Sequence, residues 1–232
     1  METTKNSQRK VLITGANRGI GLELSRHYAA LGDEVIAVCR ESAEEIENLA
    51  ELVISGIDLG SEQATETLLR ALKVSLGSDF VLDILINNAG IFQNESLEAM
   101  NFEQIRTQFD INALAPLQVT HALLPHLVSG SKVANITSRM GSLEDNTSGA
   151  YYGYRASKAA LNALGKSLAV DLKPKGIAVA QLHPGFVQTR MVGFNGDISP
   201  EQAAKGLSQR IEELNLDNSG GFWHSNGEVL PW

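Results

Sequence analysis

The chain has 232 residues, 43% of them hydrophobic and 20% charged, which fits one large globular domain with a full hydrophobic core. Its formal net charge of -8, with no cluster of Lys and Arg, argues against nucleic acid and anionic membrane surfaces as partners. Apolar runs such as FVLDILI are too short to cross a bilayer, Cys39 is a single cysteine, and the N-terminal METTKNSQRK has no apolar signal core, so we expect a cytosolic protein.

Short apolar segments alternate with longer amphipathic ones along the whole chain. Six of them are predicted to be buried strands: 10–14, 34–39, 52–58, 81–87, 132–137 and 176–182. Helical patterns lie between them, including Gly21 to Leu31, which ends at Gly32, and Phe102 to Leu127, which is interrupted near Pro116. The alternation predicts an α/β fold, a doubly wound parallel β-sheet with helices on both faces, in a single domain over residues 1–232.

A glycine-rich turn follows the first predicted strand. VLITGANRGIG places Gly15, Gly19 and Gly21 where the strand turns into the first helix. A dinucleotide needs such a turn, because it offers bare backbone N–H groups and a helix N-terminus to the pyrophosphate. The alternative is a glycine-rich turn without a ligand. Its place in the first βα unit of an alternating chain favours the dinucleotide.

The charges after the second strand bear on the choice of cofactor. An acid usually holds a free ribose 2′-hydroxyl there, but this strand is followed by Arg40, and Arg18 lies in the glycine loop. Two guanidinium groups suit a 2′-phosphate, although both are also consistent with solvated surface residues. Glu41 is a rival that would bind the ribose. We predict NADP(H), with NAD(H) left open.

The ends of the third and fourth strands complete the cofactor side. Asp58 is placed to accept a hydrogen bond from the adenine amino group, or to cap a helix before Ser61. NNAG, residues 87–90, offers small residues where the cofactor would lie close; alone it would be an ordinary turn. With the glycine loop upstream, we favour the functional interpretation.

Two overlapping Tyr-x-x-x-cation pairs occur in SGAYYGYRASKAAL: Tyr151 with Arg155, and Tyr154 with Lys158. At about 100° per residue, the second pair shares the apolar stripe of its helix, while the first is rotated by roughly 60°. We therefore expect Tyr154 and Lys158 to face a cofactor, and Arg155 to face solvent or a partner subunit. An ammonium about 4 Å away would favour the phenolate by up to about 4 kcal/mol and lower the tyrosine pKa.

Two polar residues are candidates to assist Tyr154. Ser138, after the fifth strand, is a hydroxyl donor for a substrate carbonyl, with Thr137 and Ser142 as rivals. Asn112 lies in an apolar helical stretch and needs a partner. It would either hold a water in a proton relay to Lys158 or satisfy a backbone carbonyl.

HPGFVQT, residues 183–189, follows the sixth strand. Pro184 and Gly185 would shape the cofactor site, and Thr189 would bond the carboxamide. His183 is interpreted as a packed side chain, not as a base. Further apolar residues are predicted to form a small lid that favours apolar ketones or aldehydes; they are Ile91, Phe92, Met191, Val192 and Phe194.

Taken in order, TGANRGIG, NNAG, IN, TS, YRASK and PG resemble the short, single-domain branch of the short-chain dehydrogenase/reductase family, from Val11 to about Thr189. SGGFWHSNGEVLPW and the region around YRASK are similar to its C-factor- and sniffer-like carbonyl reductases. The resemblance implies a Rossmann sheet of about seven strands and a catalytic tetrad of Asn112, Ser138, Tyr154 and Lys158. The gap between Ser138 and Tyr154 is slightly longer than the family's usual one.

The motifs and the resemblance together give a set of cofactor-binding residues and no metal ligand. The set is Gly15, Asn17, Arg18, Gly19, Ile20, Gly21, Arg40, Asp58, Leu59, Asn87, Ala89, Gly90, Tyr154, Lys158, Pro184, Gly185, Val187 and Thr189.

We predict an NADP(H)-dependent oxidoreductase that transfers a hydride between the nicotinamide and a carbonyl or alcohol carbon. A cofactor-binding signalling or regulatory protein is the alternative; the complete tetrad argues against it. A sugar-nucleotide epimerase or dehydratase is a third hypothesis, disfavoured by the short C-terminal region.

We also expect a homodimer or homotetramer, because the family often pairs through two long helices. The small residues Ala156, Ala159, Ala160 and Ala163 would permit close packing.

Overall fold

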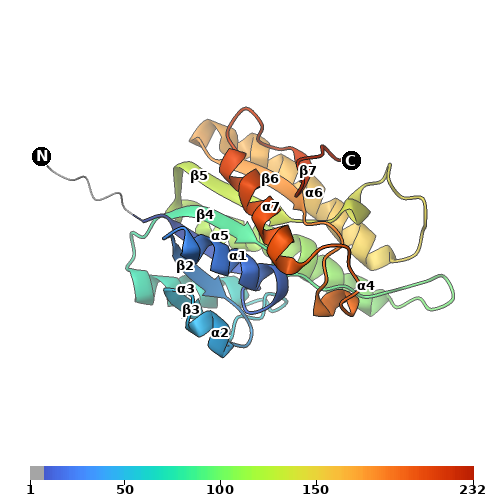
Figure 1. Cartoon of the computed structure of the whole chain (residues 1–232), viewed down its shortest axis with the longest axis horizontal. Coiled ribbons are helices and arrows are strands. Elements are labelled where there is room, and N and C mark those ends of the chain that lie inside the picture. Colours follow the sequence, from blue (N-terminus) through green and yellow to red (C-terminus); the bar gives the residue numbers. More distant parts are fainter. Residues whose placement is uncertain (1–7) are drawn as a thin grey trace, which may run out of the picture.

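A computed structural model describes residues 8–232, and the first seven residues of the predicted 1–232 domain lie outside them. These residues form one seven-stranded sheet in which neighbouring strands are parallel, in the order β3-β2-β1-β4-β5-β6-β7 (Figure 1). The strands are β1 (Lys10–Thr14), β2 (Glu34–Val38), β3 (Leu52–Ile54), β4 (Leu82–Asn87), β5 (Leu127–Ile136), β6 (Ala178–His183) and β7 (Phe222–His224). The strand order reverses between β1 and β4, and the carboxyl ends of the strands at such a point form a crevice.

Seven α-helices connect the strands of the described part of the chain: α1 (Gly19–Ala30), α2 (Glu44–Glu47), α3 (Ala64–Leu76), α4 (Phe102–Phe109), α5 (Ala115–Leu123), α6 (Tyr152–Leu172) and α7 (Pro200–Glu213). Apolar residues of α1 and α7 share one core cluster, and those of α3, α5 and α6 share another. The doubly wound fold predicted from the alternating pattern is confirmed.

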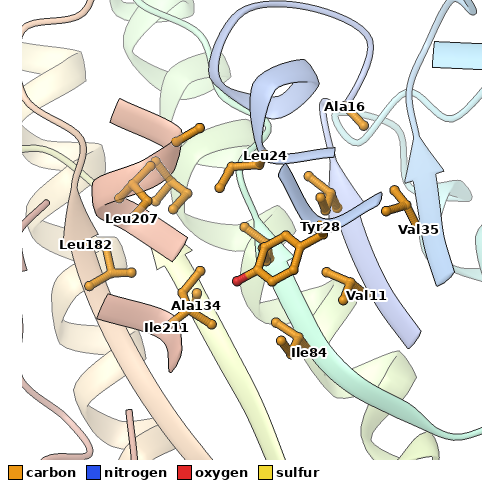
Figure 2. Packing of buried hydrophobic residues seen from close by; sticks show 14 of the residues in the cluster. Val11, Ala16, Leu24, Tyr28, Val35, Ile84, Ala134, Leu182, Leu207 and Ile211 are labelled. Atoms are coloured by element: carbon orange, nitrogen blue, oxygen red, sulfur yellow. The ribbon is translucent and has the colours of Figure 1, made fainter. Parts of the chain in front are cut away.

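Successive residues of β1 belong to opposite cores, as the strand pleat requires. Val11 and Ile13 lie in the cluster under α1 and α7, while Leu12 lies in the other. Figure 2 shows the Tyr28 ring of α1 lying over the strands among the labelled apolar side chains. Burial of both sheet faces is what produced the near-continuous apolar runs in the sequence.

The long helical region predicted over 102–127, with an interruption near Pro116, is confirmed: helical turns run without a gap from Phe102 to His126. A π-helical turn at Asp110–Leu114 separates α4 from α5, a 3₁₀ turn follows, and β5 already begins at Leu127. The π-helical turn directly precedes Pro116 in the first turn of α5, and the proline supplies no N–H to the turn before it.

Other boundaries also shift. The third strand ends at Ile54 instead of residue 58, because the chain turns at Gly56 with a φ of 78°. The first helix starts at Gly19, and Gly32 follows its end with a φ of 86°, as a helix-terminating glycine does. Among the described residues, no helix is both long and apolar enough to span a membrane.

Candidate active site

The glycine loop between β1 and α1 is folded tightly against its neighbours. Gly15 and Gly19 have φ values of 66° and 54°, which residues with a Cβ rarely adopt. Gly15 donates a hydrogen bond to the Val38 carbonyl at 2.8 Å, so the loop lies beside the end of β2. A Cβ on Gly21 would collide with the Gly15 carbonyl oxygen. All three glycines are therefore required by the turn.

The N-terminus of α1 has no cap of its own. Arg18 occupies the N-cap position without a capping hydrogen bond, and the first turn carries no acidic residue. An α-helix leaves its first N–H groups unpaired, and together with the helix dipole they favour an anion. This open end fits the pyrophosphate of a dinucleotide.

Thr14 and Asn88 connect the glycine loop to the NNAG segment. The Thr14 hydroxyl accepts from the backbone N–H groups of Asn88 and Ala89 at 3.0 and 3.1 Å. The Asn88 amide donates to the carbonyls of Thr14 and Gly15. Asn87, which we predict to bind the cofactor, has its side chain bonded to Asn135 and Thr120 in the interior. Asn88, which was not named in the prediction, is the residue whose side chain joins the two loops.

The two arginines predicted to select the cofactor lie near this loop. Arg18 and Arg40 are exposed, and within residues 8–232 neither forms an ion pair. The Asn17 amide donates to the Glu41 carbonyl at 2.9 Å, which fastens the glycine loop to the segment after β2. Arg18 and Arg40 are thus the sequence neighbours of the two residues joined by this bond.

Asp58 does not cap a helix, since α3 begins only at Ala64. Its side chain accepts from the Gly60 N–H at 3.1 Å, and the residue is exposed. Leu59 and Ile20 are partly buried against the two core clusters, where they support the loops on either side.

The second of the two tyrosine–cation pairs lies inside the site. The Lys158 ammonium is 5.9 Å from the centroid of the Tyr154 ring and donates to the Ile136 carbonyl at 2.9 Å. Tyr151 precedes α6 instead of lying within it. Arg155, predicted to face solvent or a partner subunit, is partly exposed and bonds the Ser148 hydroxyl and the Gly149 carbonyl, so it also secures the loop before the helix.

Burial is the main cause of the pKa shifts of Tyr154 and Lys158. It raises the pKa of Tyr154 to about 12, opposed by a hydrogen bond with Ser138. It also lowers the pKa of Lys158 to about 8. The pKa of Tyr154 therefore lies above its ordinary value, where a value lowered by Lys158 was expected, because removal of the phenolate from water outweighs the effect of Ser138.

Hydrogen bonding separates Ser138 from its two rivals. Ser138 is the one of the three whose hydroxyl lowers the pKa of Tyr154, and its oxygen accepts from the Met140 N–H at 3.1 Å. Thr137 donates to the Asn162 side chain at 2.7 Å in the interior. Ser142 bonds the Trp232 carbonyl. Ser138 is thus the hydroxyl placed to share a substrate oxygen with Tyr154.

Asn112 is fully buried in the π-helical turn, and its side chain is already engaged. Its amide donates to the Ile91 carbonyl and the Ser157 hydroxyl, and its oxygen accepts from the Ile91 N–H at 2.8 Å. Of the two roles predicted for Asn112, the hydrogen bond to a backbone carbonyl is the one that its side chain has. Its own carbonyl would pair in an α-helix with residue 116, which is Pro116 and has no N–H.

Gly90 lies between Asn112 and Lys158. A Cβ at Gly90 would come within 3.1 Å of the Asn112 side-chain oxygen and 3.7 Å of the Lys158 ammonium. Because glycine has no Cβ, the space beside these two side chains stays open. A planar cofactor ring could approach closely there.

The segment after β6 closes the site from the other side. A Cβ on Gly19 would lie 3.4 Å from the Thr189 methyl group, so Thr189 reaches the glycine loop. Gly185 has a φ of 100°, and the Pro184 carbonyl accepts from the Ser225 hydroxyl at 2.9 Å. Val187 is buried and pairs with Ile198, which fixes the path of this loop.

Phe92 is the predicted lid residue that contacts Tyr154, edge to face, with ring centroids 4.9 Å apart. Met191 and Phe194 are 46% and 68% exposed, and Phe186, which was not named in the prediction, is 49% exposed. The 186–194 segment thus presents apolar side chains to solvent beside the cofactor-shaping turn.

His183 is excluded as a base by its surroundings. Burial lowers its pKa to about 3, and the neighbouring His224, Arg139 and Lys158 act in the same direction. Its ring lies edge to face against His224, with centroids 4.9 Å apart. A base this weak takes up almost no protons at neutral pH.

Comparison with known proteins agrees with this geometry. The family described as short chain dehydrogenase matches residues 9–198. A curated relative from Rhodococcus sp. (strain AD45), named 1-hydroxy-2-glutathionyl-2-methyl-3-butene dehydrogenase, is 39% identical over 227 residues, which cover 96% of this chain and 99% of the relative.

Two solved structures share the whole fold. The carbonyl reductase Sniffer of D. melanogaster superimposes with a TM-score of 0.88 at 32% identity, covering 97% of this chain and 100% of that one. The NADPH-bound carbonyl reductase from chicken fatty liver gives a TM-score of 0.87 at 29% identity, covering 97% and 99%.

Proposed function

Because the chain belongs to the short-chain dehydrogenase family, an oxidoreductase family, we propose that it is an NADP(H)-dependent carbonyl reductase. The observation that carries this proposal is the convergence at Tyr154. The Ser138 hydroxyl lowers the pKa of its phenol, and the Lys158 ammonium lies 5.9 Å from its ring. Ser138 follows β5, the neighbour of β4 at the switch in strand order.

The cofactor would bind along the carboxyl ends of β1, β2 and β4. The open end of α1 would take the pyrophosphate, Arg18 and Arg40 the 2′-phosphate, and Asp58 the adenine. Lys158 would bond the nicotinamide ribose, with Thr189 at the carboxamide. When bound, NADPH supplies the hydride. The solved NADPH-bound neighbour supports this assignment.

The residues of the chain move the proton. Tyr154 gives its phenolic proton to the carbonyl oxygen as that oxygen gains charge, and Ser138 holds the same oxygen by a hydrogen bond. The high pKa of the buried phenol keeps it protonated at neutral pH, which is the form that carbonyl reduction requires. Lys158 stabilises the phenolate that remains.

Reprotonation of Tyr154 would run through Lys158 to solvent. We assign the relay at Asn112 to its backbone carbonyl, since the side chain is held by Ile91 and Ser157. A water bonded to this carbonyl would connect it to the Lys158 ammonium. Asn112 would also fix Ile91, and hence the segment that carries Phe92.

The substrate is proposed to be an apolar ketone or aldehyde. Phe92 packs on Tyr154, and Phe186, Met191 and Phe194 offer apolar surface nearby. The carbonyl reductases among the solved neighbours support this class.

A binding and turnover experiment tests the proposal. NADPH and NADH are titrated first, and NADPH consumption is then followed with a panel of ketones and aldehydes. The panel includes 1-hydroxy-2-glutathionyl-2-methyl-3-butene with NADP⁺ or NAD⁺, since a relative is named for it. Tighter binding of NADPH with turnover of carbonyls is expected. Binding without any turnover would favour the signalling or regulatory alternative.

We also propose that the protein forms a homo-oligomer and is located in the cytosol. Phe102 and Phe109 of α4 and Tyr152 and Val170 of α6 are exposed, and a homodimer or homotetramer through these helices would cover them. Sedimentation showing only a 25.0 kDa species would contradict it. The cytosol is the proposed compartment, where the buried thiol of Cys39 would stay reduced.

A further inference from the structure

Glu95 is a carboxylate fully buried in the segment between β4 and α4, with an exposed fraction of 0%. Within residues 8–232, no lysine, arginine or histidine forms an ion pair with it. A buried carboxylate is costly unless hydrogen bonds compensate its lost hydration. The hydrogen-bond partners of Glu95 therefore indicate what its burial is for.

Two of its described hydrogen-bond partners are backbone N–H groups at the start of α6, and the third is the side chain of Gln108 in α4. One carboxylate oxygen accepts from the Gly153 N–H at 3.0 Å, and the other accepts from the Gln108 side-chain amide. The Glu95 backbone carbonyl accepts from the Tyr151 N–H at 2.8 Å. Gln108 in turn accepts from the Gln93 N–H at 2.9 Å, which closes the network back onto the same segment.

The start of α6 depends on this outside support. Ala150 and Tyr151 have φ values of 50° and 52°, a left-handed conformation that costs about 1–2 kcal/mol per residue with a Cβ. The 21-residue helix has no side-chain cap at Tyr151 and no acidic residue in its first turn. Glu95 supplies the missing acceptor and negative charge from another part of the chain.

The contact is close enough to constrain position 153. A Cβ on Gly153 would come within 3.1 Å of the Glu95 carboxylate and 3.0 Å of the Ile105 Cα. Tyr154 is the next residue, and Phe92, three residues before Glu95, packs on the Tyr154 ring. Figure 1 shows that the segments preceding α4 and α6 extend from the same end of the molecule.

We propose that Glu95 is a positioning residue for Tyr154, acting as the N-cap of α6 from a distant segment. By holding the Gly153 and Tyr151 N–H groups, it sets the rotation of the first turn and thus the direction of the phenol toward Ser138. This inference rests on the proposed function only for the role of Tyr154; the capping geometry is independent of it.

A swap of side chains separates positioning from simple destabilisation. In Glu95→Gln, the new amide cannot serve both the Gly153 N–H and the Gln108 amide, because its own NH₂ group faces a donor. The double variant Glu95→Gln/Gln108→Glu restores every hydrogen bond. The amide now at position 95 accepts from Gly153 and donates to the carboxylate now at position 108, which still accepts from Gln93. Glu98→Gln, an exposed carboxylate of the same segment, is the matched control.

Each variant is measured for kcat, KM, NADPH affinity and amide hydrogen exchange over residues 151–155. Glu95→Gln is expected to lower kcat about 10- to 100-fold, with the Kd for NADPH unchanged within about twofold, and to speed exchange at these amides. The double variant is expected to recover most of both losses, and Glu98→Gln to change neither.

An unchanged kcat in Glu95→Gln would overturn the inference, as would an equal loss of NADPH binding or a double variant that recovers nothing. If the wild type reduces no carbonyl, the proposed function fails separately. Hydrogen exchange then decides alone: faster exchange reversed by the swap supports the cap, and unaltered exchange overturns it.

Discussion

The ammonium of Lys158 lies beneath the Tyr154 ring, 5.9 Å from its centroid, in a position where burial lowers its pKa to about 8. It is therefore a cation at neutral pH that releases its proton within a range accessible to experiment. Its single described hydrogen bond, to the Ile136 carbonyl, leaves two of its three donors for other partners.

NADPH binding should weaken above pH 8. The protonated Lys158 is the form that donates to the ribose and attracts phosphate, and it is lost as the pH rises through about 8. The Kd for NADPH should then rise by up to about tenfold per pH unit. Titrations from pH 6.5 to pH 10 would check this. In Lys158→Met the affinity should be lower at pH 7, and the step near pH 8 should disappear.

Lys158 also makes the fold less stable at neutral pH than it would otherwise be. Between about pH 8 and pH 10.5 the unfolded chain holds a proton that the folded chain has released, so the free energy of unfolding rises with pH. Below pH 8 the penalty is constant, of the order of 3 kcal/mol. Urea denaturation should find Lys158→Met about 1–3 kcal/mol more stable at pH 7. A Lys158→Met chain less stable than wild type, measured beside exposed Lys73→Met, would contradict this.

Arg40 should distinguish the two nicotinamide cofactors. Its exposed guanidinium follows β2, and a 2′-phosphate would give it charge-assisted hydrogen bonds. Arg40→Ala should weaken NADPH binding by about 1.5–3 kcal/mol and leave NADH binding nearly unchanged. Isothermal titration of both cofactors measures the ratio. Equal loss for both cofactors would mean that Arg40 does not read the phosphate, and Glu41→Ala tests the rival interpretation.

Helices and strands with a regular hydrophobic period were predicted from the sequence. Helix phase distinguished Tyr154 from Tyr151, because the apolar stripe of α6 is regular over 21 residues. The parallel strands were visible because both faces of the sheet are buried. β7 was not located, since its three residues, Phe222–His224, are too few to show a period.

Tertiary contacts decided what the sequence left open. The partner of Asn112 is the Ile91 backbone, 21 residues away, and no local spacing indicates it. Glutamate is a residue type that is usually exposed, and hydrogen bonds from Gln108 of α4 and Gly153 of α6 hold Glu95 in its buried position. The hydrogen bonds from Asn88 to the Thr14 and Gly15 carbonyls were likewise not indicated by the sequence, since they join residues 74 and 73 positions apart.

Three buried amides form a row across the sheet and should matter for stability. Asn87 donates to Asn135 at 2.9 Å, and Asn135 donates to Gln181 at 3.1 Å, from neighbouring positions on β4, β5 and β6. Asn135→Ala leaves a buried donor and acceptor unpaired and should cost about 1–3 kcal/mol. Chemical denaturation compares it with exposed Asn94→Ala, for which no comparable loss is expected. An Asn135→Ala chain as stable as wild type would mean that buried water replaces the amide.

The most direct test of the account compares two neighbouring tyrosines. Tyr154→Phe and Tyr151→Phe each remove one hydroxyl, and NADPH binding and carbonyl turnover are measured for both. We predict that Tyr154→Phe binds NADPH like wild type while turnover falls by about 10²–10⁴-fold, and that Tyr151→Phe keeps turnover within a few fold. Full turnover in Tyr154→Phe, or loss confined to Tyr151→Phe, would contradict the assignment of the proton donor.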